Sequence, residues 1–129
     1  MTGTRALPLL LASAFAFASP QALALNWVPL MKNTAFERFD EDDLEMFIQN
    51  GRKALNTAPE NQVMSWGNPD TGAGGDFTVL KTWQQGGRTC KEVRVRTHAS
   101  GRKGNSVVSA CQYDKKWKLI GAPRNASTR

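Results

Sequence analysis

The chain has few of the residue types that build catalytic and metal sites. Its 129 residues include one histidine (His98), two cysteines and one tyrosine. A zinc site needs several nitrogen or sulfur ligands at short spacings, which a lone histidine and two widely separated cysteines do not supply. No serine stands in a Gly-x-Ser-x-Gly sequence, and the glycines at 72–75 lack the following lysine and helix of a phosphate-binding loop. We therefore expect no enzyme and no cofactor.

Long apolar runs are also scarce. The main one, Ala6 to Ser19, is shorter than the roughly 20 residues of a membrane-spanning helix. Arg5 precedes this run, and Ala22-Leu23-Ala24 follows it with small residues where a signal peptidase would cut. We expect a signal peptide at 1–24, an N-terminal extension at 25–35, one domain at 36–121 and a polar tail at 122–129. The mature chain would then have no transmembrane segment and be periplasmic or associated with the cell envelope.

Acidic residues are rare in the C-terminal half. The net charge is +6, and from Lys81 onward twelve basic residues face only Glu92 and Asp114. Most of the acidic residues lie between Glu37 and Glu45 instead. This asymmetry is compatible with an anionic partner and also with two halves of one fold that attract each other.

The acidic run has a local explanation as the start of an amphipathic helix. Asp40 is suited to cap the first turn, Asp43 follows three residues later, and carboxylates favour the positive end of the helix dipole. Pro59 ends the helix after Ala58. The apolar face consists of Leu44, Phe47, Ile48 and Leu55, with Gly51 among them.

After Pro59 the sequence changes to short alternating runs separated by turn residues. We expect strands at 62–66, 77–84, 90–98, 106–112 and 117–120, with turns or loops at 68–75, 86–87 and 101–105. Because no crossover segments separate them, the strands should form an antiparallel meander. The predicted fold class is α+β, with one N-terminal amphipathic helix packed on a four- to five-stranded sheet. Trp66, Trp83 and Trp117 are expected to fill the core.

The two cysteines frame a predicted hairpin in an exported chain. In an oxidising compartment this arrangement indicates one disulfide, Cys90–Cys111, which leaves no free thiol. A turn centred near Arg102 would place Cys90 opposite residue 114 rather than Cys111. We therefore predict a register shift, with a bulge near Lys91 or Glu92.

These residues together resemble the C-terminal domain of the bacterial 17 kDa surface-antigen family. The resemblance rests on Trp66-x-Asn68-Pro69-x-x-Gly72, Cys90-Lys91, Gly101-Arg102, Ala110-Cys111 and Asp114 before Trp117, and it covers 36–120. The lipidation cysteine and glycine-zipper segment of the founding members have no counterpart here. The resemblance implies an envelope or surface protein, with no catalytic residues to carry over.

One cluster of side chains suggests a binding role. Guanidinium and ammonium groups on and around the predicted hairpin are candidates for recognising phosphate or carboxylate: Arg88, Arg94, Arg96, Arg102 and Lys103. Export argues against nucleic acid and for anionic lipid, lipopolysaccharide, peptidoglycan or another envelope protein. A solvated sheet face is the simpler alternative. A third hypothesis is an inhibitor that presses the loop from Gly101 to Asn105 into the cleft of an envelope hydrolase.

Overall fold

The computed structural model describes residue 3 and residues 34–125. A short 3-10 helix, η3 (Ala35–Arg38), leads into the single long helix, α1 (Glu41–Thr57). The Asp40 side chain accepts a hydrogen bond from the Asp43 backbone N–H, and the Asp43 carboxylate accepts one from the Asp40 backbone N–H, so the two residues form a capping box. The helix stops at Ala58, before Pro59, as the sequence predicts. The expected signal peptide and extension lie almost wholly outside the described residues.

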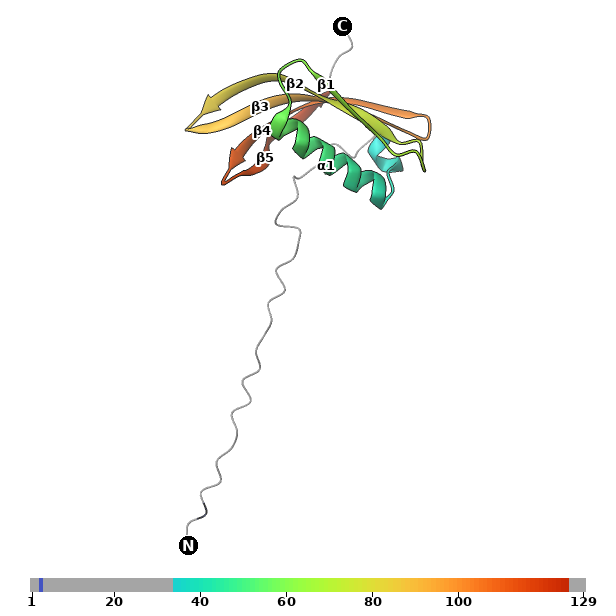
Figure 1. Ribbon diagram of the computed structural model, residues 1–129, viewed down its shortest axis with the longest axis horizontal. Helices are drawn as coiled ribbons and strands as arrows, with labels where there is room; N and C mark the ends of the chain where they lie inside the picture. The colour runs from blue at the N-terminus through green and yellow to red at the C-terminus, as the bar shows by residue number, and fades with distance from the viewer. Residues whose placement is uncertain (1–2, 4–33, 126–129) are drawn as a thin grey trace.

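Five strands follow and form one antiparallel sheet in the order of the sequence. They are β1 (Val63–Gly67), β2 (Gly74–Gln85), β3 (Arg88–Ala99), β4 (Arg102–Tyr113) and β5 (Lys116–Asn125). The sheet arches over α1, which lies along its concave side (Figure 1). The predicted meander and fold class are therefore confirmed.

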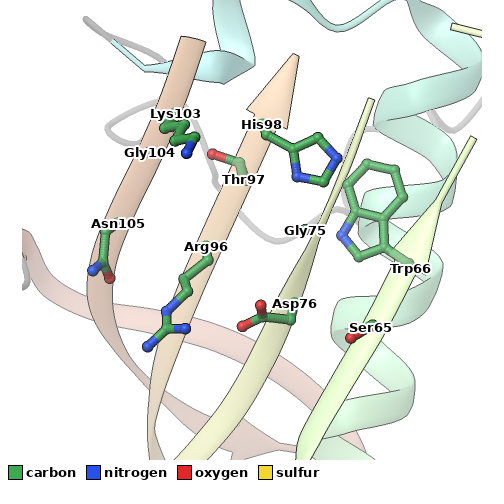
Figure 2. Close-up of a pocket in the computed structure, with 10 residues that line it drawn as sticks. All are labelled: Ser65, Trp66, Gly75, Asp76, Arg96, Thr97, His98, Lys103, Gly104 and Asn105. Atoms are coloured by element: carbon green, nitrogen blue, oxygen red, sulfur yellow. The ribbon is translucent and has the colours of Figure 1, made fainter. Parts of the chain in front are cut away.

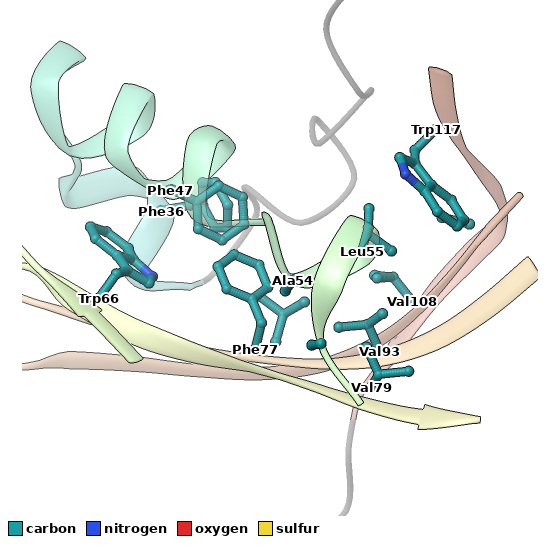
Figure 3. Close-up of a cluster of buried hydrophobic side chains, with 13 residues drawn as sticks. Phe36, Phe47, Ala54, Leu55, Trp66, Phe77, Val79, Val93, Val108 and Trp117 are labelled. Carbon is teal, nitrogen blue, oxygen red and sulfur yellow. The ribbon is translucent and has the colours of Figure 1, made fainter. Parts of the chain in front are cut away.

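The core lies between α1 and the concave side of the sheet (Figure 3). Phe47 contacts Phe36 edge to face at 4.5 Å between ring centroids and Phe77 at 5.0 Å. The other principal members are Ala54, Leu55, Trp66, Val79, Val93, Val95, Val108 and Trp117. Trp66 and Trp117 thus fill the core as expected. Trp83 does not. It is the cross-strand neighbour of Cys90, so it lies on the face of the sheet away from α1, where it is only half-buried.

Two predicted loops are longer than the turns in the structure. Gly74 and Gly75 begin β2 instead of ending a turn, and β4 starts at Arg102, so the expected loop at 101–105 is a tight turn. Ser100 and Gly101 have φ of 48° and 78°, which closes the β3–β4 hairpin in two residues. Glycine-rich and basic residues are typical of loops, but regular strand pairing satisfies their backbone groups here.

The disulfide is present, but without the predicted bulge in β3. Cys90 lies directly opposite Cys111 in an uninterrupted register, with Cα atoms 4.0 Å apart. The hairpin turns at Ser100–Gly101 rather than near Arg102, and this earlier turn alone brings the cysteines together. The register shifts lie elsewhere, in β2 between Val79 and Lys81 and in the pairing of β4 with β5 between Val107 and Ser109. Cys90 faces away from Val93 because the alternation of β3 is unbroken.

Strand alternation gives the sheet a second face, which we call the outer face. Val93, Val95, Val108 and Ala110 point towards α1, so their neighbours along β3 and β4 point away from it. The outer face carries Cys90, Cys111 and most of the basic side chains of the C-terminal half. No element of the described chain covers this face, which makes it the place to look for a binding site.

Candidate anion-binding face

The outer face contains a hollow near the β3–β4 turn. One row of side chains crosses four strands in register: Ser65 on β1, Asp76 on β2, Arg96 on β3 and Asn105 on β4. His98 and Lys103 form the next row, opposite each other on β3 and β4. Figure 2 shows these side chains around the hollow, which has a volume of about 550 Å³. We call this site, lined by these six residues, the hollow.

Two glycines of β2 make this hollow possible. A Cβ atom on Gly74 would come within 2.7 Å of the Trp66 carbonyl oxygen and 3.1 Å of the His98 ring. A Cβ atom on Gly75 would collide with the Arg96 carbonyl oxygen. Because glycine has no Cβ atom, β1 and β3 can approach β2 closely, and no side chain at Gly74 fills the space beside His98.

The hollow contains polar atoms that lack partners. Oδ1 of Asp76 and Oδ1 of Asn105 are buried acceptors without a hydrogen bond, and Nε of Arg94 in the adjacent row is a buried donor without one. Asp76 lies opposite Arg96, yet no ion pair joins them in the described chain. A buried polar group without a partner costs roughly 1–3 kcal/mol. A ligand that carries both donors and acceptors would recover part of that cost.

The five basic residues singled out from the sequence do not form one cluster. Arg96 and Lys103 line the hollow, and Arg94 is in the next row of the same face. Arg88 is at the far end of β3, where its guanidinium lies 4.2 Å from the centre of the Tyr113 ring. Arg102 is on the helix side, where it donates to Glu37 at 3.0 Å.

Ser65, Asp76 and His98 share the hollow, a combination of residue types found in hydrolases. No hydrogen bond links these three side chains in the described structure, whereas a nucleophile and its base lie within hydrogen-bond reach of each other. Among residues 34–125, no group of three or more His, Cys, Asp or Glu side chains could hold a metal ion. None of the helices in this part of the chain is long and apolar enough to cross a membrane.

The Trp66-x-Asn68-Pro69-x-x-Gly72 sequence serves the fold, because it anchors the start of α1. Oδ1 of Asp43 accepts hydrogen bonds from the Asn68 amide at 2.8 Å and from the Thr71 hydroxyl at 2.6 Å. Burial raises the pKa of Asp43, but the hydrogen bonds from Thr71, the Asp40 backbone and Asn68 outweigh it, so this pKa lies below its usual value. Asp43 therefore joins the helix to the β1–β2 loop as a carboxylate.

Lys91 and Trp117 anchor the other end of α1. The Lys91 ammonium donates to the Leu55 carbonyl oxygen at 2.6 Å, and the Trp117 indole N–H donates to the Asn56 side chain at 2.8 Å. The last turn of α1 has no basic residue of its own. Lys91 supplies the positive charge that the helix C-terminus favours.

Sequence reasoning missed the polar members of the hollow: Ser65, Asp76, His98 and Asn105. His98, the lone histidine of the sequence, fits no metal-ligand spacing, and Asn105 falls within the predicted loop at 101–105. Asp76 stands one residue before the predicted strand at 77–84, and β2 begins at Gly74, so only the longer strand places Asp76 outward by alternation. The alignment of these residues across four strands depends on the positions of the turns, which the sequence did not give correctly.

The fold and the disulfide define a small α+β domain in which one helix covers one side of a five-stranded antiparallel sheet. A family model described as the 17 kDa outer membrane surface antigen matches residues 53–118. That span is half of the chain and contains the disulfide, Lys91 and Trp117. The chain belongs to this family, as the resemblance indicated.

Individual relatives agree with this assignment. The 17 kDa surface antigen of Rickettsia conorii is 31% identical over 83 residues, which are 63% of this chain and 52% of the relative. The 17 kDa surface antigen of Rickettsia prowazekii is 30% identical over the same length, and that of Rickettsia amblyommatis is 32% identical over 74 residues. The chain thus spans about half the length of the curated relatives it matches. No solved structure matches it significantly.

Proposed function

We propose that the protein is a non-enzymatic, exported component of the bacterial cell envelope whose outer sheet face binds an anionic envelope component. Membership of the surface-antigen family and the signal-peptide pattern at 1–24 support the location. The observation that carries the binding role is the hollow, where Arg96 and Lys103 lie beside buried acceptors without partners.

The chemistry of the hollow favours a ligand that carries both signs of charge. Arg96 and Lys103 suit a carboxylate or phosphate, and the buried oxygens of Asp76 and Asn105 suit a nearby ammonium or hydroxyl donor. Peptidoglycan stem peptides and some lipid headgroups combine such groups. The shared chemistry is an anionic oxygen with a donor close to it.

A titration followed by NMR tests this proposal. The probes are a soluble disaccharide-peptide fragment of peptidoglycan and, separately, dihexanoyl phosphatidylglycerol below its micelle concentration. We expect one of them to shift the backbone amide signals of residues 96–98 and 103–105, and 0.5 M salt to weaken the binding, because partly exposed charges are screened.

Adjacent residues on opposite faces of β4 provide matched variants. Arg96→Gln with Lys103→Gln should weaken binding by on the order of 100-fold, since hydrogen bonds to charged groups contribute roughly 1.5–3 kcal/mol each. Arg102→Gln removes a neighbouring charge on the helix side and should leave binding unchanged. Equal effects of Lys103→Gln and Arg102→Gln would contradict the proposal. No observation favours the inhibitor hypothesis, which stays a prediction.

A further inference from the structure

The opposite end of the outer face carries a second group of cations, arranged around aromatic rings. The β2–β3 and β4–β5 turns lie together at the end of the sheet away from the β3–β4 turn (Figure 1). The group, which we call the hairpin-end patch, consists of Lys81, Trp83, Arg88, Tyr113, Lys116 and Lys118. All six face outward, because they share the alternation of Cys90 and Cys111.

Three of the four cations of the patch contact its aromatic rings. Arg88 and Lys118 both lie over Tyr113, at 4.2 and 5.2 Å from the ring centre, and Lys81 lies 5.7 Å from the Trp83 ring. The four cations are exposed, whereas the two rings are half-buried beneath them. Cation–π contacts order the long basic side chains on the sheet while their charges remain in contact with water.

Little negative charge opposes the patch. Glu92, opposite Lys81, is held by Arg124 at 2.7 Å. Asp114 stands in the β4–β5 turn beside Lys115, which adds a further exposed cation at the tip. Along β3, Arg88 is eight residues from Arg96, roughly 25 Å at the spacing of an extended strand, so the patch is separate from the hollow.

We infer that the hairpin-end patch docks on an anionic phospholipid bilayer. Several exposed cations without acidic partners complement a surface of lipid phosphates, and tryptophan and tyrosine favour the headgroup region of a membrane. The cations are spread over three strands around two rings, an arrangement that suits a surface of many phosphates better than one bound molecule. The inference is independent of the ligand of the hollow.

Co-sedimentation with vesicles tests the inference on the full chain in its disulfide-bonded form. Vesicles of phosphatidylcholine with 30% phosphatidylglycerol are compared with pure phosphatidylcholine. We expect binding to the anionic vesicles that decreases as salt rises. Each basic residue near an anionic surface contributes roughly fivefold to partitioning, so Arg88→Gln, Lys116→Gln and Lys118→Gln together should weaken binding by on the order of 100-fold.

Two controls separate the patch from net charge and from the hollow. Arg38→Gln with Lys53→Gln removes exposed charges from the helix side, and Arg96→Gln with Lys103→Gln removes those of the hollow. All variants share the same N-terminal segment, so differences between them report on the folded domain. Much smaller effects of both controls, scaled per charge removed, support the inference. Equal effects per charge, loss of binding only in the hollow variant, or no preference of the wild-type chain for anionic vesicles would overturn it.

Discussion

The buried Asp43 side chain explains why the sequence pattern at 68–72 is needed. It is 1% exposed, and its two oxygens accept hydrogen bonds from the Asp40 backbone, Asn68 and Thr71. A carboxylate in the first turn of a helix could be read as an acid–base group. Its buried position and its saturated hydrogen bonds make it a structural anchor instead, and the sequence 68–72 is the partner that it requires.

The depressed pKa of Asp43 predicts a pH-dependent contribution to stability. Because this pKa is lower in the folded state than the usual value near 3.9, the contribution is complete above about pH 5 and is lost as the pH falls through the folded pKa. Asp43→Asn should lower the free energy of unfolding by about 2–3 kcal/mol at pH 7. The amide N–H₂ of asparagine would replace one carboxylate oxygen and face a hydrogen-bond donor, either the Asp40 backbone N–H or the Asn68 and Thr71 side chains. The cost should be smaller at pH 3.

Urea unfolding followed by tryptophan fluorescence at the two pH values measures this difference. Asp42→Asn is the matched control, because Asp42 is exposed in the same helical turn and should cost less than about 1 kcal/mol. A penalty for Asp43→Asn that is equal at pH 7 and pH 3 would show that the carboxylate charge is not what matters.

At the scale of elements, α1 is attached to the sheet at both ends by polar contacts and along its length by apolar ones. Asn68 and Thr71 hold its start, and Lys91 and Trp117 hold its last turn. These residues belong to separate strands and loops, so they fix the direction of the helix across the sheet. Their spacing in the sequence follows from this geometry.

Lys91→Met should destabilise the domain by about 1–2 kcal/mol. The substitution keeps most of the apolar stem that packs near Trp117 but removes the donor to the Leu55 carbonyl and the charge at the helix C-terminus. Thermal unfolding by circular dichroism measures the change. Lys53→Met, at an exposed position of α1, should have little effect; if the two variants lose equal stability, the Lys91 contact contributes nothing specific.

The sequence predicted elements well where a local cause decides them. Asp40 and Pro59 bracket α1 because capping and the missing proline N–H act within a few residues. The number and order of strands followed from turn residues and alternation. The register of β3 with β4 was predicted less well. The turn lies at Ser100–Gly101 rather than near Arg102, and this difference changes every cross-strand partner.

Only part of the candidate site could be predicted for the same reason. Arg94 and Arg96 are two residues apart in the predicted strand at 90–98, so alternation puts them on one face, and the structure agrees. The separation of Arg88, the pairing of Arg102 with Glu37 and the place of Asp76 in the hollow depend on contacts between distant segments. The close approach at Gly74 and Gly75 is visible only once three strands are assembled, since the glycines resemble turn residues in isolation.

At the scale of the whole molecule, the disulfide joins the two central strands next to the hairpin-end patch. Cys90 and Cys111 are buried on the outer face, between Trp83 on β2 and Lys118 on β5. The bond thus holds together the two hairpins whose tips form the patch. A domain of this size buries only about two-thirds of its unfolded surface, so a covalent link of this kind matters for stability.

Replacing both cysteines by alanine should lower the free energy of unfolding by ~3 kcal/mol, the loop-entropy value for cysteines this far apart. Equilibrium unfolding in urea with and without a reductant measures the same quantity on the unaltered chain. The two experiments should agree, because the chain has two cysteines and reduction opens the one bond between them. An unchanged midpoint after verified reduction would contradict the stabilising role.

The hollow and the hairpin-end patch lie at opposite ends of β3 and β4. Each of these strands has twelve residues, and their pairing is continuous from Cys90–Cys111 to Ala99–Arg102, so one ladder connects the two regions. With the hairpin-end patch on a bilayer, the hollow lies on the same face of the sheet, up to roughly 25 Å from the patch along the strands. A ligand of the hollow is then held within that distance of the lipid surface.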